Sequence, residues 1–214
     1  MTDPQPYRAP FSIVVAALSA SIILTYIAFW FASPQTQNLL DYVFAVIPAR
    51  FDPQSQLHFA TWYEPLGPLF GHAWLHGAWW HAAVNAFFLY ALGRVPALHL
   101  GWARFLLLYL VSAAAGALAF VAFNWGGRDI AVGASDGVCG VFVAYFLSVR
   151  PRWQDSLRIP LVRNQLGMII FLNVVVMGVL AELNVFPIAW EGHLGGFLGG
   201  FLAYVALEPR ARRA

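Results

Sequence analysis

The chain has 214 residues, of which 60% are hydrophobic and only 10% are charged, and its formal net charge is +2. A soluble domain carries about a quarter charged residues, so this composition indicates an integral membrane protein. The small positive charge comes from arginine alone and gives no reason to expect a nucleic-acid partner. The single cysteine, Cys139, excludes an intramolecular disulfide framework and a multi-cysteine metal site.

Six apolar segments approach or reach the roughly 17–25 residues that a helix needs to span a bilayer. In chain order they are Phe11–Ala32, Trp79–Gly93, Phe105–Trp125, Ile130–Val149, Gln165–Ala181 and Ile188–Leu207. No small-residue cleavage site follows the first segment, which predicts a retained span rather than a removed signal peptide. We therefore predict an all-α polytopic membrane protein with six transmembrane helices, folded as one domain over residues 1–214.

The distribution of arginine orients the predicted spans. With six spans both termini lie on one side, and that side holds ten arginines against two on the other. An excess of positive charge marks the cytoplasmic side. We expect cytoplasmic tails at residues 1–10 and 208–214. The lysine-free, arginine- and alanine-rich composition is typical of a bacterial protein, which would place it in the inner (cell) membrane.

Residues 33–71 form a connection that is long for a loop and too apolar to be simply solvated. It mixes aromatic residues and prolines with a few acids. Such a segment is expected to lie in the outer, extracytoplasmic interface of the membrane, partly as short amphipathic helices.

Polar side chains gather at the second predicted span, in the run "HAWLHGAWWHAAVN" at residues 72–85. His72 and His76 are four residues apart, as are His81 and Asn85, so each pair is expected to share a helix face. Polar groups inside a bilayer are expensive and indicate function.

Two more polar residues are expected at the same depth in the outer half of the membrane. Ser135 lies in "VGASDGVCG" near the start of the fourth span, and His193 lies about one turn into the sixth. Glycines four residues apart let helix backbones approach closely. Both spans carry such glycines, at Gly133 and Gly137 in the fourth and at Gly192, Gly196 and Gly200 in the sixth.

If these two spans pack through their glycines, Ser135 comes within hydrogen-bond reach of His193. A hydroxyl beside a neutral imidazole is the minimal activated nucleophile. The start of a helix adds free backbone N–H groups for a developing oxyanion. His81 and Asn85, on a neighbouring span, could supply further donors to the same oxygen.

These motifs resemble those of the rhomboid family, the six-helix intramembrane serine proteases. The histidine–asparagine run, "GASD" and "HLGGFLGG" lie in the expected order, and the resemblance covers residues 11–207. It implies Ser135 as the nucleophile and His193 as the general base and acid, with no metal and no cofactor. It implies an oxyanion hole formed by the Ser135 backbone N–H, His81 and Asn85. It also implies supporting roles for His76, Gly133, Gly196 and Gly200, with His72 at the periphery.

Three positions depart from the family pattern. Asp136 stands where glycine usually follows the serine, and Cys139 stands where many relatives have an aromatic residue. The usual Trp-Arg pair before the histidine run is absent, with Gly67 and Pro68 in that region. A carboxylate beside an oxyanion hole would oppose its charge. One residue along a helix is about 100° around the axis, so we expect Asp136 to point elsewhere.

We therefore predict an intramembrane serine protease that hydrolyses peptide bonds in or near transmembrane helices of its protein substrates, within the lipid bilayer. The oligomeric state stays open. A catalytically inactive relative that binds transmembrane helices is the main alternative, and Asp136 favours it. A histidine metal site, a proton-relay transporter and a structural subunit are further alternatives. The first lacks a carboxylate or cysteine at the right depth, the second lacks polar groups in the inner half, and the third leaves the Ser135–His193 coincidence unexplained.

Overall fold

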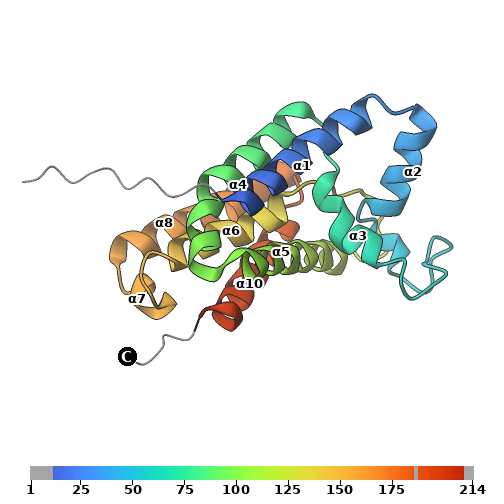
Figure 1. Ribbon diagram of the computed structural model, residues 1–214. Helices are drawn as coiled ribbons and strands as arrows, with labels where there is room; N and C mark the ends of the chain where they lie inside the picture. The colour runs from blue at the N-terminus through green and yellow to red at the C-terminus, as the bar shows by residue number, and fades with distance from the viewer. Residues whose placement is uncertain (1–11, 186–187, 210–214) are drawn as a thin grey trace, which may run out of the picture.

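The computed structural model describes residues 12–185 and 188–209 (Figure 1). Within these residues the regular structure is helical, and the one β-type pairing is an isolated bridge between Val46 and Ala131. The predicted all-α fold is confirmed. The predicted tail at residues 1–10 and most of the tail at 208–214 lie outside the described residues. The tails and the single-domain organisation stay predictions.

The α-helices of the described residues range from five to 22 residues in length. They are α1 (Ile13–Trp30), α2 (Pro34–Phe44), α3 (Leu66–Gly71), α4 (Trp79–Leu100), α5 (Trp102–Phe123), α6 (Ser135–Leu147), α7 (Trp153–Leu157), α8 (Pro160–Ile170), α9 (Met177–Glu182) and α10 (Trp190–Leu207). Two short 3₁₀ helices are η1 (Pro48–Arg50) and η2 (His72–Trp74), and a π-helical turn, η3 (Phe171–Val176), joins α8 to α9. Figure 1 shows α2 and α3 at one end of the bundle and α7 at the other.

Four helical segments of the described chain are long and apolar enough to cross a membrane. They are α1, α4, α5 and the continuous segment Pro160–Glu182, formed by α8, η3 and α9. The helix α6 is apolar but shorter, with 13 residues, and the glycine-rich α10 has 18. The chain is a membrane protein by these spans. The total of six spans and the cytoplasmic side of the termini stay predictions.

Three predicted span bounds differ from the helix ends by five residues or more. The fifth span was predicted to begin at Gln165, but α8 begins at Pro160. Arg94 marked the end of the second span in the sequence, but α4 continues through Pro96 to Leu100. A charged residue can mark the membrane surface, whereas a helix ends where its backbone hydrogen bonds end. This helix ends at Gly101, whose φ of +82° favours glycine.

The fourth span was predicted to begin at Ile130, but α6 begins at Ser135. The preceding residues are not helical because their main chain pairs elsewhere. Ala131 exchanges two hydrogen bonds of 3.0 Å with Val46, in the connection between α2 and η1. This pairing fixes the chain that leads into α6.

The helix α10 packs between α5 and α6, and glycines form both of its contact faces. Toward α6, a Cβ on Gly196 would overlap the main chain of Asp136, and one on Gly200 would overlap the main chain of Gly140. Toward α5, a Cβ on Gly195 or Gly199 would overlap Ala115. The backbones of the three helices therefore approach more closely than side chains would allow.

Residues 33–71 contain short helices, as the sequence predicts, and pack over the C-terminal end of α5. Val46 is fully buried against Phe120 and Val121 of that helix. The Ala49 N–H donates to the Gly127 carbonyl at 2.8 Å, beside the Val46–Ala131 bridge. The placement of this segment in the membrane interface stays a prediction.

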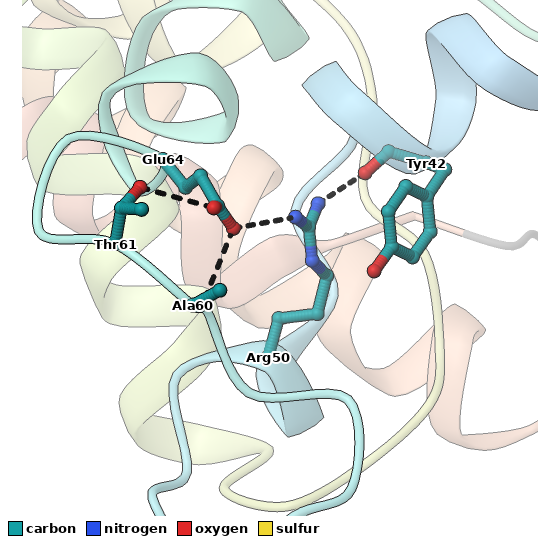
Figure 2. A network of polar contacts seen from close by, with 5 residues as sticks. All are labelled: Tyr42, Arg50, Ala60, Thr61 and Glu64. Carbon is teal, nitrogen blue, oxygen red and sulfur yellow. Dashed lines mark hydrogen bonds and ion pairs between the residues drawn. The ribbon is translucent and has the colours of Figure 1, made fainter.

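Arg50 holds this segment together (Figure 2). Its side chain is only 5% exposed, and its guanidinium donates to the carbonyl of Tyr42 and pairs with the Glu64 carboxylate at 3.9 Å. Glu64 in turn accepts hydrogen bonds from the Ala60 N–H at 3.2 Å and the Thr61 hydroxyl at 3.0 Å. A single arginine thus joins α2 to the loop that precedes α3.

Replacing Arg50 by leucine is expected to destabilise the segment. The guanidinium lies 4.2 Å from the Tyr42 ring centre and 4.3 Å from that of Phe59, and the variant loses both contacts together with the Glu64 pair. Each cation–π contact is worth about 0.5–2 kcal/mol. We expect a lower thermal midpoint in detergent and faster proteolysis within residues 33–71. Arg128→Leu changes an exposed arginine and serves as the control; equal effects of the two variants would contradict this role for Arg50.

Candidate active site

The chain entering α6 is held by the segment that precedes α4. The Gly133 N–H donates to the His72 carbonyl at 2.9 Å, and the Ala134 N–H donates to His76 Nε2 at 3.2 Å. Ser135 follows directly as the first residue of α6. The backbone around the predicted nucleophile is therefore fixed by two of the histidines that the sequence singled out.

His76 is the centre of a small polar network. The residue is 3% exposed. Its Nε2 lies 3.3 Å from the Asn85 side-chain amide and accepts the Ala134 N–H. Both partners can donate, so Nε2 is the acceptor and the ring proton sits on Nδ1, which lies 3.4 Å from the Trp74 carbonyl. His76 therefore connects α4 to the start of α6.

The prediction that His72 and His76 share a helix face is wrong. His72 begins the 3₁₀ helix η2, which ends at Leu75 in extended conformation, and His76 lies beyond it. Residues four apart share a face only if the chain between them is helical, and here the chain becomes extended at Leu75. Each histidine consequently contacts a different part of the chain leading into α6.

His81 and Asn85 do share a face of α4. The Asn85 amide donates to the His81 carbonyl at 3.0 Å and also lies against His76, so both of its hydrogens have partners. The His81 ring packs on Gly133, where an added Cβ would lie 2.6 Å from the ring. Gly133 also has a φ of +130°, which favours glycine. Across the described residues, neither ring nitrogen of His81 forms a hydrogen bond, which leaves it as a donor for a ligand.

His193 lies in the first turn of α10 and is 8% exposed. Its Nδ1 is 3.3 Å from the carbonyl of Asn173, in the π-helical turn η3. A carbonyl can only accept, so this contact requires the proton on Nδ1 and leaves a lone pair on Nε2. His193 also lies near His81. The sequence analysis did not single out Asn173, although an asparagine in the middle of an apolar span was a usable signal.

Ser135 and His193 lie on helices whose backbones touch at Asp136 and Gly196. Nevertheless, in the part of the chain that the structure describes, the Ser135 hydroxyl makes no hydrogen bond with His193. Catalytic hydrogen bonds in unliganded enzymes are often long and tighten only when substrate binds. The Ser135 side chain is partly exposed, so a ligand can reach it.

An open hollow of about 410 Å³ reaches this cluster from the ends of α1 and α2. It is lined by Tyr26, Phe29, Trp30, Gln37, His76 and Gly77. Among the described residues no group of three or more His, Cys, Asp and Glu side chains is arranged to hold a metal ion.

A helical bundle with membrane-length spans defines a polytopic membrane protein, and this one has polar side chains buried together where three of its helices begin. Residues 61–210 match the family described as Rhomboid domain. The chain is also 33% identical over 134 residues to RHOMBOID-like protein 1 of Arabidopsis thaliana, a match that takes in 63% of this chain and 32% of that protein. The matched region thus spans about a third of that relative's length.

The chain therefore belongs to the rhomboid family, as its motifs predicted. Members of this family are generally serine proteases, and membership supports an intramembrane-protease fold, whether active or inactive.

Proposed function

We propose that this protein is an intramembrane serine endopeptidase that uses Ser135 and His193. One observation carries the proposal: Ser135 begins α6, His193 lies in the first turn of α10, and the two helices touch through Gly196. A serine and a histidine at neighbouring helix starts can form a nucleophile and its base. The contact of His193 Nδ1 with Asn173 supports this assignment, because it leaves Nε2 free to take a proton.

In the proposed reaction the Ser135 oxygen attacks a peptide carbonyl while His193 Nε2 accepts its proton. The developing oxyanion accepts a hydrogen bond from the Ser135 N–H, which has no intrahelical acceptor because it lies in the first turn of α6. The side chains of His81 and Asn85 donate further hydrogen bonds to the same oxygen. His193 then gives its proton to the leaving amine. Water next hydrolyses the acyl-enzyme, with His193 again taking and returning a proton.

The proposed substrates are membrane proteins cleaved in or near a transmembrane helix. A helical peptide hides its carbonyls in intrahelical hydrogen bonds, so the chain must locally unwind before attack. Small or helix-weakening residues near the outer face of the membrane would make this easier. The hollow beside His76 supports the proposal, because hydrolysis needs a route for water into the cluster. We further propose that the protein resides in a bacterial inner membrane.

The alternative is an inactive rhomboid that binds transmembrane helices without cutting them. The missing hydrogen bond between Ser135 and His193 and the acid at Asp136 favour it. The two functions differ in whether Ser135 reacts with an electrophile.

The test uses a serine-reactive fluorophosphonate and a defined transmembrane substrate with the purified protein in detergent and in liposomes. We expect labelling and cleavage, and a loss of roughly 10³-fold or more in both Ser135→Ala and His193→Ala. Ser148→Ala, at the other end of α6, and the exposed His58→Ala serve as matched controls and should react normally. Full reaction of the two site variants would rule out this dyad, and an unreactive unmutated protein with several substrates would favour the inactive relative.

A further inference from the structure

The residue after the proposed nucleophile forms a buried pair with a histidine. Asp136 is 7% exposed and its Oδ2 lies 3.3 Å from Nε2 of His72, which is 1% exposed. The acid comes from the first turn of α6 and the histidine from η2, far apart in the chain. The acid that departs from the family pattern therefore has a partner of its own.

The neighbouring helices leave room for this carboxylate. A Cβ on Gly192 of α10 would lie 2.8 Å from Oδ1 of Asp136, and a Cβ on Gly116 of α5 would overlap the carboxyl group. Two glycines from two helices thus form a seat that side chains would close. Asp136 occupies this seat as a fitted residue of the bundle.

The two contacts of the His72 ring, one hydrogen bond at Nδ1 and one ion-pair contact at Nε2 that is not aligned as a hydrogen bond, require a shared proton. Its Nδ1 lies 2.7 Å from the Pro68 carbonyl, which can only accept, so Nδ1 carries a proton. Its Nε2 faces Asp136, and an unprotonated Nε2 opposite an ionised carboxylate would bring two acceptors together in a buried site. One further proton removes this conflict, either on the imidazole or on the carboxylic acid.

Other titratable groups surround the pair. His76 lies near His72, while His81 of α4, Tyr109 of α5 and Cys139 of α6 lie near Asp136. None of these side chains bears a permanent charge, so the pair holds its proton without a fixed cation beside it.

The pair also holds the chain that contains Ser135. The His72 carbonyl accepts the Gly133 N–H at 2.9 Å, and the His72 ring contacts Asp136. Residues 133–136 are thus held at both ends by one histidine, with Ser135 between the two contacts.

We propose that His72 and Asp136 share a proton and together set the position of Ser135, which makes both of them positioning residues for the nucleophile. This inference rests on the proposed function of Ser135. Asp136 then has a supporting role, and replacing it is expected to lower the activity of the protein. An inhibitory Asp136 would instead give a higher activity when replaced.

The experiment is a double-mutant cycle on the rate of fluorophosphonate labelling of the full chain. We expect Asp136→Ala and His72→Phe each to slow labelling by about 10–100-fold, because a misplaced nucleophile loses rate steeply. The double variant is expected to be no slower than the slower single variant, since each change already breaks the pair. Asp136→Ala combined with His99→Phe, which changes a histidine at the far end of α4, is the control and should be additive.

The conservative variant Asp136→Asn separates positioning from folding. Its amide fills the same seat and donates to His72 Nε2, so labelling is expected within about threefold of the unmutated rate. Three results would each overturn this inference alone: additive effects of the two single variants, a loss of labelling in Asp136→Asn as large as in Asp136→Ala, or faster labelling of Asp136→Ala. An unlabelled unmutated protein would overturn the proposed function and this inference with it.

Discussion

Replacing Gly200 by leucine is expected to abolish labelling of Ser135 and to remove cooperative thermal unfolding of the bundle. A side chain at Gly200 would meet the main chain of Gly140, whose carbonyl carbon and oxygen lie 3.1 Å from the position of the new Cβ. No flexible side chain can yield there, so α6 and α10 must separate. Overpacking a core costs about 1–3 kcal/mol or more, a large share of a net stability of about 5–15 kcal/mol.

The loss of labelling follows from the same displacement. Ser135 and His193 lie on the two helices that Gly200 holds together, and a shift of about 1 Å can lower a rate by about 10²-fold. Labelling rates and thermal midpoints in detergent measure the two effects. Gly200→Ala should be intermediate in both.

Gly167→Leu is the matched control for this prediction. Gly167 lies inside α8, and a Cβ there would meet no atom within 4 Å. A helix-interior glycine is less stable than alanine by about 0.5–1 kcal/mol, so this variant should be at least as stable as the unmutated protein. If Gly200→Leu kept its thermal midpoint and labelling rate, the close approach of α6 and α10 would not be needed for the site.

Local patterns made the helical fold and the glycine contacts predictable. An apolar stretch of membrane length specifies a helix by itself, and a glycine period of four marks one face of it. The bounds were less predictable because they depend on distant partners. Ala131 pairs with Val46 and lies outside α6, and no sequence feature near residue 131 indicates this strand-like contact.

The polar network was predictable in its members and not in its connections. The sequence singled out His72, His76 and Asp136, but spacing alone put the two histidines on one helix. The 3₁₀ turn at η2 sends them to different partners, with His72 against Asp136 and His76 against Ala134. The π-helical turn that brings the Asn173 carbonyl to His193 likewise depends on packing across the bundle.

Replacing His81 by alanine is expected to lower the rate of substrate cleavage by about 10²–10³-fold, the usual effect of losing one oxyanion donor. Its ring is fixed on Gly133, two residues before Ser135, and within the described structure it has no hydrogen-bond partner that a substrate oxygen would have to displace. Folding should change little, because alanine removes only a ring at the edge of the cluster.

Asn85→Ala gives the comparison that decides which side chain is the main donor. The Asn85 amide already serves His81 and His76, so it must give up one of these contacts to reach an oxyanion. We expect about a tenfold loss of cleavage and a lower thermal midpoint, since His76 loses a partner. Gly133→Ala should lower the cleavage rate about as much as His81→Ala, because the new Cβ would push the His81 ring away. The double variant should cleave little more slowly than either single variant. If Asn85→Ala instead reduced cleavage more than His81→Ala at an unchanged midpoint, the amide would be the principal donor, and its bond to His76 would have to open in every catalytic cycle.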